Sequence, residues 1–126
     1  MKIHHLLGAM CLCFGIGTLS AQNYQKTSSG IRTTVNAVDI EVQFFAPAVV
    51  RVIKSPEGVA YAKQSLSVIA KPEEVHFKTA IKDNRIVLNS SDLSICVDTR
   101  TGVVSYLSKG GKTLLTEKNG VQFAPF

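Results

Sequence analysis

The feature that most constrains the fold of this chain is a succession of short segments in which apolar and polar residues alternate. The clearest segment covers residues 38–44, where every second residue is apolar and Asp39, Glu41 and Gln43 stand between. Such period-two alternation predicts a β-strand with one buried and one polar face. After residue 21, no window carries the repeat of three to four residues that an amphipathic helix needs. The sequence therefore predicts an all-β protein.

Further β-rich segments follow along the chain, and turn-forming residues separate them. The predicted strands cover residues 49–54, 65–70, 77–82, 85–89, 93–97, 103–107 and 113–117. Asp83 and Asn84 stand between two of these segments, and both residue types tolerate the left-handed backbone of a tight hairpin turn. Short strands about ten residues apart are typical of an antiparallel β-sandwich or barrel. We predict one antiparallel β-sandwich.

The first 21 residues follow the plan of a secretory signal. Lys2 supplies a positive start, and residues 6–19 form an uncharged apolar run. Small residues at Ser20 and Ala21 precede the polar Gln22. This order predicts a signal helix cut between Ala21 and Gln22, or one or two residues away. The protein is therefore predicted to be exported, to the periplasm or the extracellular space.

Two other roles for the apolar run are less well supported. A membrane anchor needs roughly 20 apolar residues, and this run is shorter and rich in glycine. A lipoprotein signal would place a small residue before its cysteine, whereas Met10 and Leu12 precede Cys11 and Cys13. We therefore prefer soluble export without a stable membrane anchor.

Removal of the signal leaves 105 of the 126 residues, which suits a single domain. The polar residues 22–30 are expected to form a flexible lead-in, and residues 31–126 the sandwich. The mature net charge is +4, because the signal holds one of the 14 Lys and Arg residues and none of the nine acids. The basic residues are scattered singly, whereas a nucleic-acid surface gathers them on one face. The sequence does not favour nucleic-acid binding.

Nucleophilic and metal chemistry has few candidate residues after the signal. Cys96 is then the lone cysteine and His76 the lone histidine. Together they provide neither a disulfide nor the ligand set that zinc requires. We predict no catalytic nucleophile, no metal site and no cofactor site. Cys96 is expected to be a half-covered thiol on the polar face of its strand, and His76 a surface residue.

One pair of carboxylates is a candidate for glycoside hydrolysis, which uses two carboxyl groups across the scissile bond. Asp39 and Glu41 share one face of a strand, about 6.6 Å apart by strand geometry. No apolar residues are arranged around them to raise the pKa of one, as a general acid requires. We interpret the pair as part of a solvated face. Residues 89–91 (NSS) match the N-glycosylation pattern, which matters only in a eukaryotic source.

Two regions carry motifs of a known family. The first is residues 44–52 (FFAPAVVRV), a strand, a proline and a strand. The second comprises residues 93–97 (LSICV), 102–104 (GVV) and 111–117 (GKTLLTE). In order and spacing they resemble the N-terminal region of glycoside hydrolase family 31, the α-glucosidases and α-xylosidases. The resemblance covers residues 24–126.

The resemblance implies a galactose mutarotase-like β-sandwich that packs beside a catalytic (β/α)8 barrel. The barrel of that family carries the catalytic aspartates, so no catalytic residue transfers to this chain. The sandwich of the family continues through a further passage, whereas this chain stops at Phe126, which leaves the completeness of the sandwich open. We expect the non-catalytic N-terminal domain of an exported α-glycosidase, inactive alone, with the barrel or an oligosaccharide as partner.

Two alternatives from other classes stay open, and so does the oligomeric state. One is a free-standing exported carbohydrate-binding module, which would display aromatic side chains on one face. The mature chain offers Tyr24, Tyr61 and Tyr106, five phenylalanines and no tryptophan. The other is an immunoglobulin-like structural module. The apolar tail, residues 121–126, is expected to be exposed and prone to aggregation or fraying.

Overall fold

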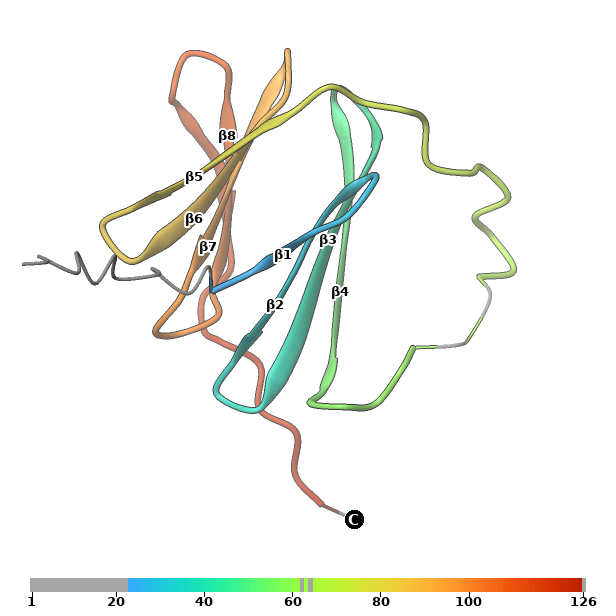
Figure 1. Ribbon diagram of the computed structural model, residues 1–126, viewed down its shortest axis with the longest axis vertical. Coiled ribbons are helices and arrows are strands. Elements are labelled where there is room, and N and C mark those ends of the chain that lie inside the picture. The colour runs from blue at the N-terminus through green and yellow to red at the C-terminus, as the bar shows by residue number, and fades with distance from the viewer. Residues whose placement is uncertain (1–22, 62, 64, 126) are drawn as a thin grey trace, which may run out of the picture.

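The computed structural model describes residues 23–61, 63 and 65–125. The predicted signal helix and its cleavage site between Ala21 and Gln22 lie outside these residues. The described chain forms two antiparallel β-sheets and no helix, so the all-β prediction is confirmed for it (Figure 1). Accordingly, none of these residues forms a helix that could cross a membrane.

Each sheet follows the order of its strands in the sequence. Sheet A consists of β1 (Gln25–Lys26), β2 (Gly30–Val35), β3 (Val38–Ala46) and β4 (Val49–Pro56). Sheet B consists of β5 (Lys78–Lys82), β6 (Arg85–Asn89), β7 (Leu93–Asp98), β8 (Val104–Ser108) and β9 (Thr113–Thr116). All neighbouring strands are antiparallel and joined by short connections, except where β4 leads to β5 across the two sheets.

One cluster of buried apolar side chains joins the two sheets. The alternation predicted for residues 38–44 is observed in β3, where the apolar residues are buried and the polar ones face outward. Burying a large apolar side chain contributes about 1.5–3 kcal/mol, so this shared cluster is the main source of stability. It gives the sheets a sandwich-like arrangement of two layers. The cluster comprises Ile31, Val35, Val38, Ile40, Val42, Phe44, Val75, Ile86, Leu88, Ile95, Val97 and Val104.

Two tight hairpin turns have left-handed backbone at both central residues. The predicted turn at Asp83 and Asn84 is confirmed, with φ angles of 50° and 58°. The turn between β2 and β3 has φ angles of 51° at Asn36 and 60° at Ala37. Turns of this kind match the twist of the adjoining strands and favour glycine at the second position. Because Ala37 stands there instead, the sequence analysis found neither this hairpin nor strand β2.

Part of the polar lead-in is a strand. β1 pairs with β2, with Gln25 opposite Arg32 and Lys26 opposite Ile31. Gly30 begins β2 and lies close to β3, because a Cβ atom there would stand 1.8 Å from the backbone oxygen of Val42. Only glycine fits this close approach of two strands.

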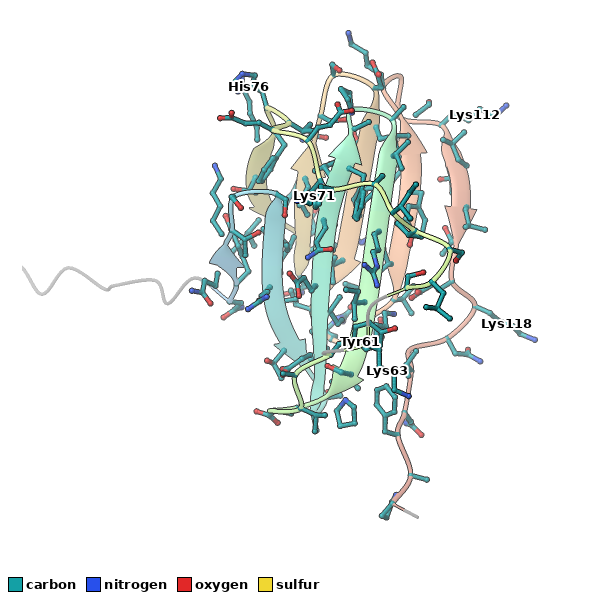
Figure 2. All side chains as sticks on the ribbon, turned by 90° about the vertical axis from the view of Figure 1, so that its right-hand side faces the viewer. Tyr61, Lys63, Lys71, His76, Lys112 and Lys118 are labelled. Carbon is teal, nitrogen blue, oxygen red and sulfur yellow. The ribbon has the colours of Figure 1, made fainter. Side chains whose placement is uncertain are left out.

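The strand expected over residues 65–70 is wrong, because none of the described residues there has strand pairing. The Ser65 Oγ atom instead accepts a hydrogen bond from the backbone N–H of Val68 at 3.2 Å. Local bonds of this kind compete with a strand ladder. The segment belongs to the connection between β4 and β5, residues 57–77, which we call the strap. Its described residues pass over the face of sheet A that points away from sheet B, until Val75 near its end joins the buried cluster (Figures 1 and 2).

Candidate functional site

A hollow of about 820 Å³ opens on the outer face of sheet A and extends to Tyr24, before β1, and to Thr99, after β7. Polar side chains from β2, β3 and β4 line its sheet side, and the beginning of the strap forms another wall. Figure 2 shows Tyr61 on this part of the strap, in front of the sheet. Among the lining residues are Arg32, Thr34, Asp39, Glu41, Ser55 and Tyr61.

The structure brings the carboxylate of Asp39 into this hollow and fixes it with hydrogen bonds. The Thr34 hydroxyl donates to Asp39 Oδ1 at 2.6 Å, and the Gly58 backbone N–H donates to Oδ2 at 2.9 Å. These bonds, from Thr34 first and Gly58 second, lower the pKa of Asp39 below its ordinary value. Asp39 is therefore ionised near neutral pH, which does not suit a general acid.

The second carboxylate, Glu41, is held in an ion pair. Glu41 stands directly opposite Arg32 in the sheet, and Arg32 Nη2 lies 3.2 Å from Glu41 Oε1. The Gln43 side-chain amide donates to the same oxygen at 2.7 Å. Asp39 and Glu41 thus each bind the residue directly opposite on β2. Such cross-strand pairs fit the interpretation of the two carboxylates as part of a polar sheet face.

A cation–π contact joins the strap to the sheet. Arg51 on β4 pairs with Gln43 on β3, and its guanidinium carbon lies 5.8 Å from the ring centroid of Tyr61. Such a contact orients an aromatic ring without burying it. The sequence analysis did not single out Arg32, Arg51 or Tyr61 for this face. The contact depends on strand register and on the path of the strap, and neither leaves a local signal in the sequence.

The remaining candidates lie elsewhere. His76 is exposed near the end of the strap, away from Tyr61 (Figure 2). Cys96 is free and half-buried on β7, as expected, and burial raises the pKa of its thiol, partly offset by Arg85. Asn89, in the glycosylation-like segment, is exposed and accepts a hydrogen bond from the Ser94 hydroxyl. Among the residues that the structure describes, no three His, Cys, Asp or Glu side chains gather to hold a metal.

A second surface feature is the flank of the molecule where β4 and β9 are the edge strands, which we call the open flank. The side chain of Lys54, only 7% exposed, donates to Glu117 Oε2 and, at 2.9 Å, to the Gly102 carbonyl. Glu117 also accepts from the Val104 N–H at 2.9 Å. This pair links the two sheets at their edges.

Apolar side chains next to that pair are uncovered. Leu115 stands opposite Tyr106, and cross-strand partners point to the same side, which here is the core side of sheet B. Leu115 is nevertheless 61% exposed, and Leu114 beside it is 57% exposed. Val121 and Phe123 in the apolar tail are also exposed, as predicted. Figure 2 shows β9 to one side of the strands of sheet A.

Comparisons with known proteins identify no relative of this chain. No protein-family model matches the chain, and no curated protein matches it. The outer-face hollow and the open flank are therefore the two features from which a function has to be argued.

Proposed function

We propose that this chain is the non-catalytic N-terminal β-sandwich, of the galactose mutarotase-like kind, of an exported family 31 α-glycosidase. The observation that carries the proposal is the open flank, where core-side apolar surface at Leu115 has no cover from sheet A. Exposed apolar surface at a sheet edge is typical of an interaction surface. The occupant we propose is the catalytic barrel.

The positions of the family-like motifs support this proposal. Residues 44–52 span the end of β3 and the beginning of β4, and residues 93–97 lie in β7. Residues 111–117 contain β9, the strand at the open flank. Most residues of these motifs therefore lie in strands, which is compatible with the resemblance.

The state of the two carboxylates also supports a domain without its own hydrolytic chemistry. A glycosidase needs one carboxyl group that is protonated near neutral pH. Asp39 is hydrogen-bonded in its ionised form, and Glu41 is paired with Arg32. In the proposed enzyme, the acid and the nucleophile belong to the barrel.

A hydrolysis assay tests the catalytic part of the proposal. The purified chain is incubated with α-glucosides and α-xylosides, and reducing sugar is measured. We expect no release above the protein-free control. Hydrolysis that disappears in Asp39→Asn or Glu41→Gln would overturn the proposal.

An association assay tests the proposed partner. The chain is mixed with the barrel of a family 31 α-glycosidase made without its own sandwich, and co-elution is measured. We expect a complex that Leu115→Asp disrupts. Leu66→Asp is the matched control, because Leu66 is a fully exposed leucine on the strap and belongs to neither edge strand of the open flank. Absence of a complex, or equal loss with both variants, contradicts the proposal.

The hollow on sheet A favours a second candidate, the free-standing exported carbohydrate-binding module. That candidate uses the polar face and Tyr61 and needs no partner at the open flank. The association assay separates the two, because only the first candidate binds the barrel.

A further inference from the structure

We propose that the hollow on the outer face of sheet A is a binding site for a short neutral oligosaccharide. Its polar side is the ion pair of Arg32 and Glu41, and its aromatic wall is Tyr61. This combination of planar polar groups and an aromatic ring provides both kinds of surface that a sugar ring needs, one for its hydroxyls and one for its C–H face.

The ion pair keeps unused hydrogen-bonding capacity. A guanidinium has five N–H donors, and the side chain of Arg32 is 62% exposed although one nitrogen is bound to Glu41. Both recorded bonds to Glu41, from Arg32 and Gln43, end on Oε1, and a carboxylate has a second oxygen that can accept. Donors and acceptors therefore stand side by side, as adjacent hydroxyl groups of a sugar require.

Tyr61 has one contact with the sheet and still exposes much of its ring. The Arg51 guanidinium holds its ring, while 51% of the residue remains exposed. An aromatic face carries partial negative charge, which attracts the partially positive C–H groups of an apolar sugar face. A rigid tyrosine supplies this contact at a small cost in side-chain entropy.

Charge in the hollow favours a neutral ligand over a phosphate or a carboxylate. Arg32 is neutralised by Glu41, and the ionised Asp39 is bound by Thr34 and Gly58. The volume of about 820 Å³ lies in the usual range for small-molecule sites, about 300–1,000 Å³. Because the hollow is open to solvent on the sheet surface, binding is expected to be weak, with a Kd of about 1 mM.

The choice of an α-linked sugar rests on the proposed function, whereas the neutral sugar class rests on the residues of the hollow. The probe is maltotriose, titrated into the isotope-labelled full chain while backbone amide signals are recorded by NMR. We expect shifts confined to residues that line the hollow. Tyr61→Ala and Arg32→Ala should each weaken binding about tenfold, the equivalent of about 1.4 kcal/mol.

Two variants serve as matched controls. Leu66→Ala changes an exposed side chain of the same strap, and Lys112→Ala removes a positive charge at the distant β8–β9 turn (Figure 2). Both should bind maltotriose as the wild type does. Absence of shifts, shifts outside the hollow, or equal weakening by the controls would overturn the site. A preference for β-linked cellotriose would overturn the choice of linkage.

Failure of the site and failure of the proposed function give different results. Sugar binding at the hollow without association at Leu115 keeps the site and overturns the proposed domain role. Association with the barrel without sugar binding keeps the domain role and overturns the site.

Discussion

The two flanks of the sandwich are held together in different ways. At the flank where β1 faces β5, the Tyr24 hydroxyl donates to the Thr79 hydroxyl at 2.9 Å, and Lys26 Nζ lies 5.1 Å from the ring centroid of Phe77. We call this the closed flank. At the open flank, a charged pair, Lys54 and Glu117, links the sheets.

The difference lies in what covers the core. Phe77 reaches inward at the closed flank, and its ring centroid lies 5.5 Å from that of the buried Phe44. At the open flank the ring of Tyr106 packs against the core, but Leu115, its partner on β9, stays exposed. A buried ion pair costs desolvation energy and is strongly destabilising only when one partner is lost. The closed flank thus spreads its stability over several contacts, whereas the open flank concentrates it in one pair.

Among changes at the two flanks, the largest expected effect is that of Glu117→Gln at the open flank. This change leaves the charge of Lys54 buried beside a neutral amide and the Gly102 carbonyl. We expect a loss of about 2–3 kcal/mol in the free energy of unfolding, since charge-assisted bonds of this kind are the strong ones. Urea denaturation followed by circular dichroism measures it.

The matched change on the other partner should cost less. Lys54→Met removes the buried charge, and Glu117, which is 29% exposed, keeps water and the Val104 N–H as partners. We expect a loss of about 1 kcal/mol, and little net change in the double variant Lys54→Met with Glu117→Leu. If Lys54→Met costs more than Glu117→Gln, the pair does not hold the flank in the way we describe.

Tyr24→Phe at the closed flank should have a smaller effect than Glu117→Gln. It removes one neutral hydrogen bond, to Thr79, and keeps the ring, so we expect a loss of about 1 kcal/mol by the same denaturation measurement. Tyr61→Phe is the control and should change stability by less than about 0.5 kcal/mol, because Tyr61 is exposed. A loss for Tyr24→Phe as large as that for Glu117→Gln would remove the difference between the flanks.

The sequence predicted the features that have a local pattern better than the contacts between the two sheets. The alternation in β3 and the turn at Asp83 and Asn84 are local signals, and both are confirmed. The partners Lys54 and Glu117 are 63 positions apart, so only the packing of two sheets brings them together. A lysine in a β-rich run gives no local sign that it points inward, as Lys54 does.

The candidate site was also predictable only where a local pattern indicates it. The polar face with Asp39 and Glu41 could be predicted from the period of one strand. Arg32 joins it through the β2–β3 register, and the turn that sets this register was hidden by Ala37. Tyr61 belongs to a segment without periodicity, where no local pattern indicates the position of the strap.

Tyr106 lies at the open flank, and its titration is expected to lower the free energy of unfolding slightly at high pH. Burial, and secondarily the charge of Glu117, raises the pKa of Tyr106 above its ordinary value near 10. The folded chain then holds the phenol proton more tightly than the unfolded chain. This contribution to stability is complete below about pH 10 and is lost as the pH rises through the raised pKa.

Denaturation at about pH 9 and about pH 11 measures this effect. It is best done in a Cys96→Ser background, because burial also raises the pKa of Cys96. Tyr106→Phe should reduce the loss of stability between the two pH values. An unchanged loss would mean that the Tyr106 hydroxyl titrates as it does in the unfolded chain.

The smallest expected effect on stability is that of Leu115→Thr. Leu115 points to the core side of sheet B but is 61% exposed, so the change should alter the free energy of unfolding by less than about 0.5 kcal/mol. Leu88 is the matched control, a leucine of the same sheet that is fully buried, and Leu88→Thr should cost about 3 kcal/mol. Light scattering at increasing concentration should show less self-association for Leu115→Thr than for the wild type. If Leu115→Thr instead destabilises the chain as Leu88→Thr does, Leu115 is part of the core, and the two flanks are equally closed.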